Sequence, residues 1–262
     1  MKKHTVSDKY NESKYNHLLT YLLTPKYPRP LRERDRERGK KAGFTLAEVL
    51  ITLGIIGVVA AMTIPNLITA HKAHQLHSQF LKSYSVIQQA FRQMEADDVS
   101  TDPSAHAPNT FYKTFGQYLK VAVHCGNYSA NKSSVCWTID TPYKTLNGKN
   151  NAWTDLFDNG QFVLMDGTNV LIENPPGVPG RTWVSVDLNG YRNKPNRWGY
   201  DLFTFDFVDG ELRTMGSKGT YYSANLEKYC SLSDTSNING ITCAHKAKTD
   251  ADYFKRVIKN VK

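Results

Sequence analysis

A single carboxylate inside a long apolar run constrains this chain more than any other feature. From Phe44 to Ile64 every residue is apolar, glycine or threonine except Glu48. At about 1.5 Å per residue, a helix of this length spans roughly 30 Å, which is the thickness of a bilayer core. A charged side chain is costly in a membrane, so Glu48 needs a cationic partner or a position near the helix end. The run therefore predicts a membrane-spanning helix that contains one functional acid.

The segment before the apolar run is polar and cationic. Residues 1–43 hold 12 Lys or Arg against five acids and so carry most of the net charge of +9. This asymmetry predicts that the segment stays on the cytoplasmic side of a membrane, and it argues against a nucleic-acid-binding role. A secretory signal would be cleaved after the apolar run, but the composition does not change after Ala60-Ala61-Met62. A signal anchor with a disordered basic head is the simple alternative.

The residues Gly43-Phe44-Thr45-Leu46-Ala47-Glu48 resemble the cleavage and methylation motif of type IV prepilins and type II secretion pseudopilins. In that family a basic leader ends in glycine, and a membrane aspartyl peptidase cuts on the cytoplasmic side of the apolar helix. The resemblance implies cleavage between Gly43 and Phe44 and methylation of the new Phe44 amine. It also implies that Glu48 pairs with the N-terminal amine of a neighbouring subunit during assembly. The leader, residues 1–43, is longer than is usual in the family.

The physical chemistry of Glu48 agrees with this resemblance. After cleavage Glu48 would lie in the first turn of the helix, where the helix dipole favours a negative charge. A buried carboxylate is far less costly when a cation pairs with it, and a neighbouring Phe44 ammonium would supply that cation. The alternative is a carboxylate at the level of the lipid head groups. Gly54, Gly57 and Pro65 weaken the helix, so we expect it to bend or open locally between them.

Beyond Pro65 the chain becomes amphipathic, and the helix is expected to continue to about Ala96. Apolar residues recur there at helical spacing, at Phe80, Tyr84, Ile87, Phe91 and Met94. From about Thr110 the sequence turns to short β-rich segments separated by Asp-Gly turns. The expected strands are residues 162–165, 169–172, 182–187, 202–208 and 211–215. We therefore expect an α+β, pilin-like fold in which the helix packs on an antiparallel meander of three to five strands.

Four cysteines lie after the apolar run and none before it, which is typical of an oxidising exterior. Three pairings are open. Cys125 with Cys136 and Cys230 with Cys243 are favoured because both pairs close short loops in polar, turn-rich segments. The second pair would resemble the C-terminal disulfide loop of many pilins. A reactive His124-Cys125 pair is the alternative to the first.

Three further groups of residues have both a functional and a structural interpretation. The oxygen-rich residues 187–201 offer ligands for calcium, but their spacing does not match an EF-hand, so a structured loop is favoured. His71, His74 and His77 are regularly spaced, yet no acid or cysteine accompanies them, so a solvated face is favoured. We therefore expect no metal and no cofactor. The aromatic residues of the second half could bind a glycan or partner, but core and subunit interface are favoured.

Together these features predict a leader at 1–43, a helix at 44–96 that spans the membrane over 44–64, and an α+β head at 97–262. The resemblance implies a non-enzymatic pilin, minor pilin or pseudopilin of a pilus or of a secretion filament. Its expected partners are the prepilin peptidase and methyltransferase, other subunits, an inner-membrane assembly platform and the membrane. Its expected location is the inner membrane with an extracytoplasmic head, and then a pilus or periplasmic pseudopilus. A signal-anchored extracytoplasmic binding protein or hydrolase is the alternative, although no catalytic motif supports it.

Overall fold

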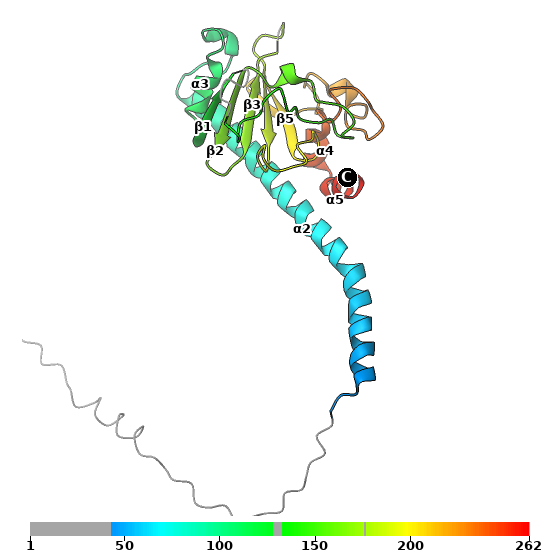
Figure 1. Ribbon diagram of the computed structural model, residues 1–262. Helices are drawn as coiled ribbons and strands as arrows, with labels where there is room; N and C mark the ends of the chain where they lie inside the picture. The colour runs from blue at the N-terminus through cyan, green and yellow to red at the C-terminus, as the bar shows by residue number, and fades with distance from the viewer. Residues whose placement is uncertain (1–42, 128–132, 176, 262) are drawn as a thin grey trace, which may run out of the picture. The chain divides into compact units, whose positions relative to one another are not determined.

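The computed structural model describes residues 43–127, 133–175 and 177–261, so the expected leader lies outside the described residues except for Gly43. The chain divides into two compact units, Met1–Leu53 and Gly54–Lys262, which are described separately. One helix, α2 (Leu46–Ala96), begins in the first unit and continues into the second (Figure 1). Its length and apolar N-terminal half are sufficient to cross a membrane.

The sequence predicts that α2 either bends or opens locally near Pro65, and because α2 stays helical through Pro65 the local opening is wrong. Proline leaves one carbonyl of the preceding turn without its usual N–H donor. Nearby side chains donate to other carbonyls of the same region. The Thr69 hydroxyl donates to the Pro65 carbonyl at 2.8 Å, and the Thr63 hydroxyl donates to the Val59 carbonyl at 2.9 Å. These bonds help to hold the helix together where proline weakens it.

The C-terminal half of α2 buries one face against the sheet. Its buried residues recur every three or four positions, at Ala73, Leu76, Phe80, Ser83, Ile87, Ala90, Phe91 and Met94. Phe80 packs edge-on against Phe203 at a centroid distance of 5.0 Å, and Phe91 stacks on Phe207 at 3.9 Å. The predicted amphipathic face is therefore confirmed, except that Tyr84 is only partly buried.

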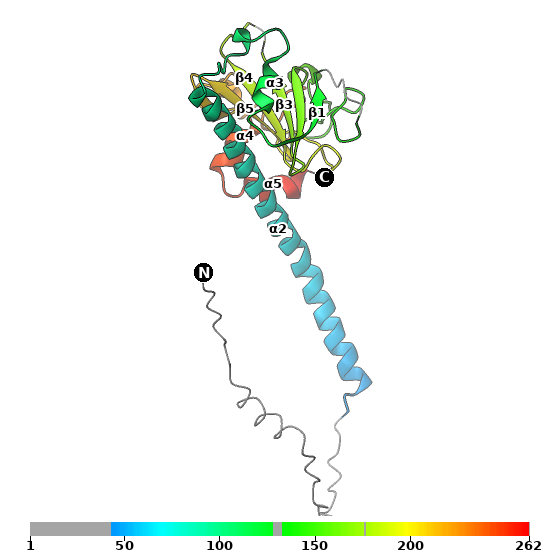
Figure 2. The same cartoon turned by 90° about the vertical axis from the view of Figure 1, so that its left-hand side faces the viewer.

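The sheet has six antiparallel strands in the order β1-β2-β3-β4-β5-β6 (Figure 2). The strands are β1 (Val121–Gly126), β2 (Gly160–Leu164), β3 (Asn169–Glu173), β4 (Thr182–Asp187), β5 (Leu202–Val208) and β6 (Glu211–Thr214). The meander and its five expected strands are confirmed, but the expected number was too low because β1 was missed. Strand β1 pairs with β2 through two register irregularities.

Loops cover the face of the sheet that α2 leaves free. They form a second hydrophobic cluster around Trp137, Tyr143, Phe157 and Trp198. Trp183 is also buried, whereas Trp153 is 42% exposed. Most of the aromatic residues of the head are therefore core residues, because a sheet covered on both faces needs two apolar layers.

Short helices complete the head. They are α3 (Phe111–Gly116), α4 (Cys243–Thr249) and α5 (Tyr253–Asn260), together with single turns η1 (Pro103–Ala105), η2 (Thr154–Leu156) and η3 (Ser223–Asn225). Phe254 of α5 packs against Phe80 of α2 and Phe203 of β5, at centroid distances of 6.2 and 5.6 Å. Two disulfides join Cys125 to Cys136 and Cys230 to Cys243, the two short-loop pairings that the sequence favours.

Candidate processing and assembly site

The first turn of α2 is closed by a reciprocal pair of side chains. The backbone N–H and the hydroxyl of Thr45 donate to Oε2 of Glu48, at 2.8 and 2.9 Å. In return the backbone N–H of Glu48 donates to Oγ1 of Thr45 at 3.2 Å. This arrangement is a capping box, in which each side chain satisfies a backbone donor that the helix cannot satisfy itself. The helix therefore begins at Leu46 and holds Glu48 in its first turn.

The residues before this turn are open to the outside. A side chain added at Gly43 would meet no atom within 4 Å, and Phe44 is 88% exposed. Neither residue is part of a helix or strand. A peptidase that cuts between Gly43 and Phe44 would therefore find an accessible, irregular backbone directly before the helix.

The apolar side chains that follow are not covered by any other part of residues 43–127, 133–175 and 177–261. They remain exposed from Leu46 to Ile68, and Leu67 and Ile68 are still 70% and 61% exposed. A continuous apolar surface of this length is stable only in a bilayer or against other proteins. Glu48 is the sole acid on it, so the site combines an apolar helix, a glycine boundary and one carboxylate.

Comparison with known proteins identifies this combination. The family described as the prokaryotic N-terminal methylation motif matches residues 38–64. The chain carries the type IV prepilin signature. The prepilin signature covers Gly43, Phe44 and Glu48, and with the apolar helix it fits a membrane-anchored pilin that prepilin peptidase processes. No curated protein and no solved structure matches the chain.

The capping box was not predicted, although its sequence pattern is present. Thr45-Leu46-Ala47-Glu48 has threonine and glutamate three positions apart directly before an apolar run, which is the usual sign of a helix start. The sequence interpretation assigned Glu48 only to the helix dipole and to a neighbouring subunit. Glu48 of the prepilin signature therefore has a further role within its own chain, which is to cap the start of α2.

A second polar cluster lies in the head, where calcium was weighed against a structured loop. Asp187 and Asp201 are fully buried. The Tyr143 hydroxyl and the Gly190 N–H donate to Asp187, at 3.0 and 3.1 Å. The N–H groups of Asn196 and Arg197 donate to Asp201, at 2.9 and 2.6 Å.

Both carboxylates therefore serve as hydrogen-bond acceptors that hold the 187–201 loop. Burial raises the pKa of Asp187, and the nearby Asp201 charge raises it further. Within residues 43–127, 133–175 and 177–261, no group of three or more His, Cys, Asp or Glu is arranged to hold a metal. The described residues His71, His74 and His77 thus form no metal-binding group, and the His77 ring packs against the Phe254 ring at a centroid distance of 5.8 Å.

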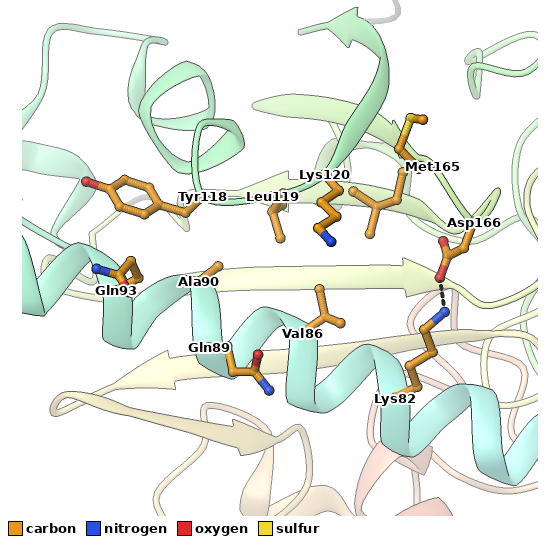
Figure 3. A pocket seen from close by; sticks show the side chains of 11 residues that line it. Lys82, Val86, Gln89, Ala90, Gln93, Tyr118, Leu119, Lys120, Met165 and Asp166 are labelled. Carbon is orange, nitrogen blue, oxygen red and sulfur yellow. Dashed lines mark hydrogen bonds and ion pairs between the residues drawn. The ribbon is translucent and has the colours of Figure 1, made fainter. Parts of the chain in front are cut away.

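A groove of about 540 Å³ lies between α2 and the β2–β3 turn (Figure 3). Its floor is apolar, with Val86, Ala90 and Leu119, and an ion pair between Lys82 and Asp166 at 2.5 Å closes one end. The buried acids Asp187 and Asp201 do not line it. The acid that does line the groove, Asp166, has a lowered pKa, because the opposing effect of burial is outweighed by hydrogen bonds from Lys82 and Thr168. The groove therefore presents a paired carboxylate, not the acid with a raised pKa that marks many catalytic sites.

Buried acids elsewhere in the head predict how its stability depends on pH. Burial raises the pKa of Asp201 and of Asp206 from 3.8 to about 6. Burial, with Asp158 and Asp155 nearby, raises the pKa of Glu173 from 4.5 to about 9. The folded state holds these protons more tightly than the unfolded state. Their stabilising contribution is therefore complete below the unfolded values and is lost as pH rises through about 6 and then about 9.

We expect the melting temperature of the full chain in detergent to fall between about pH 5 and pH 8, by on the order of 5 °C. Thermal unfolding followed by near-UV circular dichroism measures it. Glu173→Gln, which keeps the side chain neutral, should flatten the upper part of this curve. The matched control is Glu227→Gln, since Glu227 is 81% exposed and pairs with Lys246 at the surface. A melting temperature that rises across this range would contradict the prediction.

Proposed function

We propose that this chain is a structural, non-enzymatic subunit of a type IV pilus or of a secretion pseudopilus. Prepilin peptidase would remove residues 1–43, and the amine of Phe44 would be methylated. The mature chain would comprise the helix 44–96, inserted in the inner membrane over 44–64, and the extracytoplasmic head 97–262. The assembly platform would then move it from the membrane into the filament.

One observation carries the proposal: a lone acid lies in the first turn of a helix whose apolar surface contacts no other described part of the chain. In the described part of the chain, the hydrogen bonds of the Glu48 carboxylate all use Oε2. Oε1 is therefore available to a further donor. When apolar helices of several subunits pack together, the Phe44 ammonium of a neighbour is a donor that also neutralises the charge.

Processing gives the first test. We expect Gly43→Arg to block cleavage, because the peptidase site would have to accommodate a long charged side chain where glycine presents none. Intact-mass spectrometry of membrane-extracted protein should show the wild type beginning at Phe44 and the variant retaining the leader. Gly57→Ala is the control, since Gly57 lies inside α2, away from the cleavage boundary, and a side chain there meets nothing within 4 Å.

Two outcomes would contradict the proposal. A wild-type protein that keeps residues 1–43 in a host with prepilin peptidase would indicate a signal anchor, and hence the binding protein or hydrolase. Efficient cleavage of the arginine variant would place the cleavage boundary elsewhere. Either result is read directly from the mass of the purified chain.

A further inference from the structure

We propose that a cationic surface at the base of the head, formed by Lys72, Lys255 and Lys259, docks on the anionic phosphate head groups of the membrane that holds α2. We call these three residues the basal lysines. The inference goes beyond the filament role, because it requires only that the apolar half of α2 is inserted in a bilayer. It concerns the subunit before assembly, when the head stands next to the lipid surface.

The first step is the position of α5. Phe254 packs against His77 at a centroid distance of 5.8 Å and against Phe80 at 6.2 Å. The buried face of α2 begins at Ala73, so α5 contacts the first turns of α2 that belong to the head. Figures 1 and 2 both show α5 at the edge of the head from which α2 emerges.

The second step is the distance from the lipid. The proposed span ends at Ile64, and the apolar side chains of Leu67 and Ile68 lie about one turn beyond it, at the depth of the head groups. A head-group layer is about 5 to 7 Å thick on each side of the hydrocarbon core. Lys72 is four residues past Ile68, or about 6 Å beyond that layer, which is within one Debye length at physiological ionic strength. His77, which α5 contacts, is nine residues past Ile68, or about 14 Å beyond the layer, which is between one and two Debye lengths.

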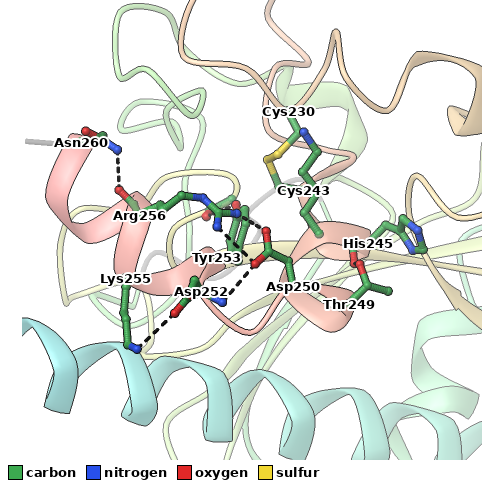
Figure 4. Close-up of polar contacts among 12 residues, drawn as sticks. Cys230, Cys243, His245, Thr249, Asp250, Asp252, Tyr253, Lys255, Arg256 and Asn260 are labelled. Atoms are coloured by element: carbon green, nitrogen blue, oxygen red, sulfur yellow. Dashed lines mark hydrogen bonds and ion pairs between the residues drawn. A yellow bond between two sulfur atoms is a disulfide. The ribbon is translucent and has the colours of Figure 1, made fainter.

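The third step is the charge. Residues 66–82 contain two lysines and no acid, and α5 contains three cations and no acid. The acids that face α5 precede it: Asp252 accepts from Lys255 at 3.1 Å, and Asp250 pairs with Arg256 (Figure 4). These pairs are exposed and weak.

Two of the basal lysines have no acidic partner. In the part of the chain that the structure describes, Lys72 and Lys259 form no ion pair, and the Lys72 ammonium lies 5.3 Å from the Tyr200 ring centre. Lys255 and Lys259 are four positions apart on α5 and so project from the same side of the helix. The base of the head therefore keeps a net positive charge that the protein itself does not neutralise.

Lysine footprinting tests the proposal on the full chain. The protein is inserted into nanodiscs of phosphatidylcholine, or of phosphatidylcholine with about a third phosphatidylglycerol, and acetylated briefly. Mass spectrometry then gives a rate for each lysine. We expect Lys72 and Lys259 to react about fivefold more slowly in the anionic discs, because each basic residue near an anionic surface gains about this factor in local binding.

The same sample contains its own controls. Lys113 and Lys218 are exposed. Lys113 belongs to α3, and Phe115 of α3 packs against Phe91 of α2 at a centroid distance of 4.7 Å. Phe91 lies fourteen residues farther along α2 than His77, or about 20 Å farther from the membrane. The rate of Lys113 should not depend on the lipid. Lys72→Gln with Lys259→Gln should remove the protection of Lys255, whereas Lys113→Gln with Lys218→Gln should preserve it.

Further arms decide the source of the anion. Salt at about 0.5 M should abolish the protection, because it shortens the Debye length to about 4 Å. Soluble glycerol phosphate added to phosphatidylcholine discs should not protect the basal lysines from acetylation. Protection in that sample would show that the surface binds a free phosphate and would overturn the lipid proposal. Equal rates in both discs would also overturn it. Disc insertion is verified by size-exclusion chromatography, so this failure is distinct from a failure of processing or assembly.

Discussion

Replacing Glu48 by valine is expected to yield a subunit that inserts, is cleaved and folds its head, but is largely excluded from filaments. Valine is cheaper than glutamate in lipid, so membrane insertion should improve. In an assembled filament, however, the variant leaves the Phe44 ammonium of the next subunit in apolar surroundings without a counter-charge. We expect the ratio of filament to membrane subunit to fall by at least about tenfold, since loss of one partner of a buried pair is strongly destabilising.

The capping box provides a control that separates the two roles of Glu48. Thr45→Ala removes the hydroxyl that bonds to the carboxylate and accepts from the Glu48 N–H, but it leaves the backbone N–H of residue 45 and the acid in place. It should loosen the first turn and still permit assembly. The measurement is the subunit content of sheared filaments against membranes for both variants and the wild type. If Glu48→Val assembles normally, or if both variants fail to the same extent, the intersubunit role of Glu48 is wrong.

Removal of the disulfide between Cys230 and Cys243 is the second large effect. The bond closes a short loop, a sequence separation of 13, and such bonds stabilise by roughly 3 kcal/mol. It also fixes the start of α4 beside the turn at Gly199, where an added side chain would lie 2.8 Å from the Cys243 sulfur. We expect replacement of both cysteines by serine to lower the melting temperature by about 10 °C.

The other disulfide is the matched comparison for this variant. Cys125 and Cys136 are also buried and close a loop of similar size, but they secure the edge strand β1. Hydrogen exchange should therefore rise in α4 and α5 for the first variant and near β1 for the second. Peptide mapping of the wild type under non-reducing conditions should recover both pairs. Free thiols or crossed pairs would contradict the expected connectivity.

The sequence predicted the long helix and five strands because their signals are local. A period of about 3.6 in apolar residues and Asp-Gly turns between apolar runs act within a few positions. Strand β1 was missed because its residues alternate weakly and its pairing with β2 is irregular. Helices α4 and α5 were missed because they are short, and helices of this length depend on tertiary packing, such as that of Phe254 in α5 on Phe80 and Phe203.

The candidate site and the basal lysines differ in the same way, because a local pattern reveals the first and only tertiary structure reveals the second. Gly43, Phe44 and Glu48 were recognisable as a motif, and the capping box was available from the Thr45–Glu48 spacing alone. The basal lysines could not be recognised in this way, because Lys72 and Lys259 lie on helices that are far apart in the chain and meet only where Phe254 packs against His77. A surface built from distant segments depends on tertiary structure, which no local pattern encodes.

The irregular edge of the sheet would have a consequence in the proposed filament. Strand β1 forms one edge of the sheet, and a regular edge strand offers unpaired backbone groups to any similar strand nearby. In a filament, many identical heads would be held within touching distance. The bulges of β1 and its covalent tie at Cys125 prevent a flat ladder from continuing into the next head. At the β1 edge, the heads of the proposed filament could thus be crowded without joining their sheets.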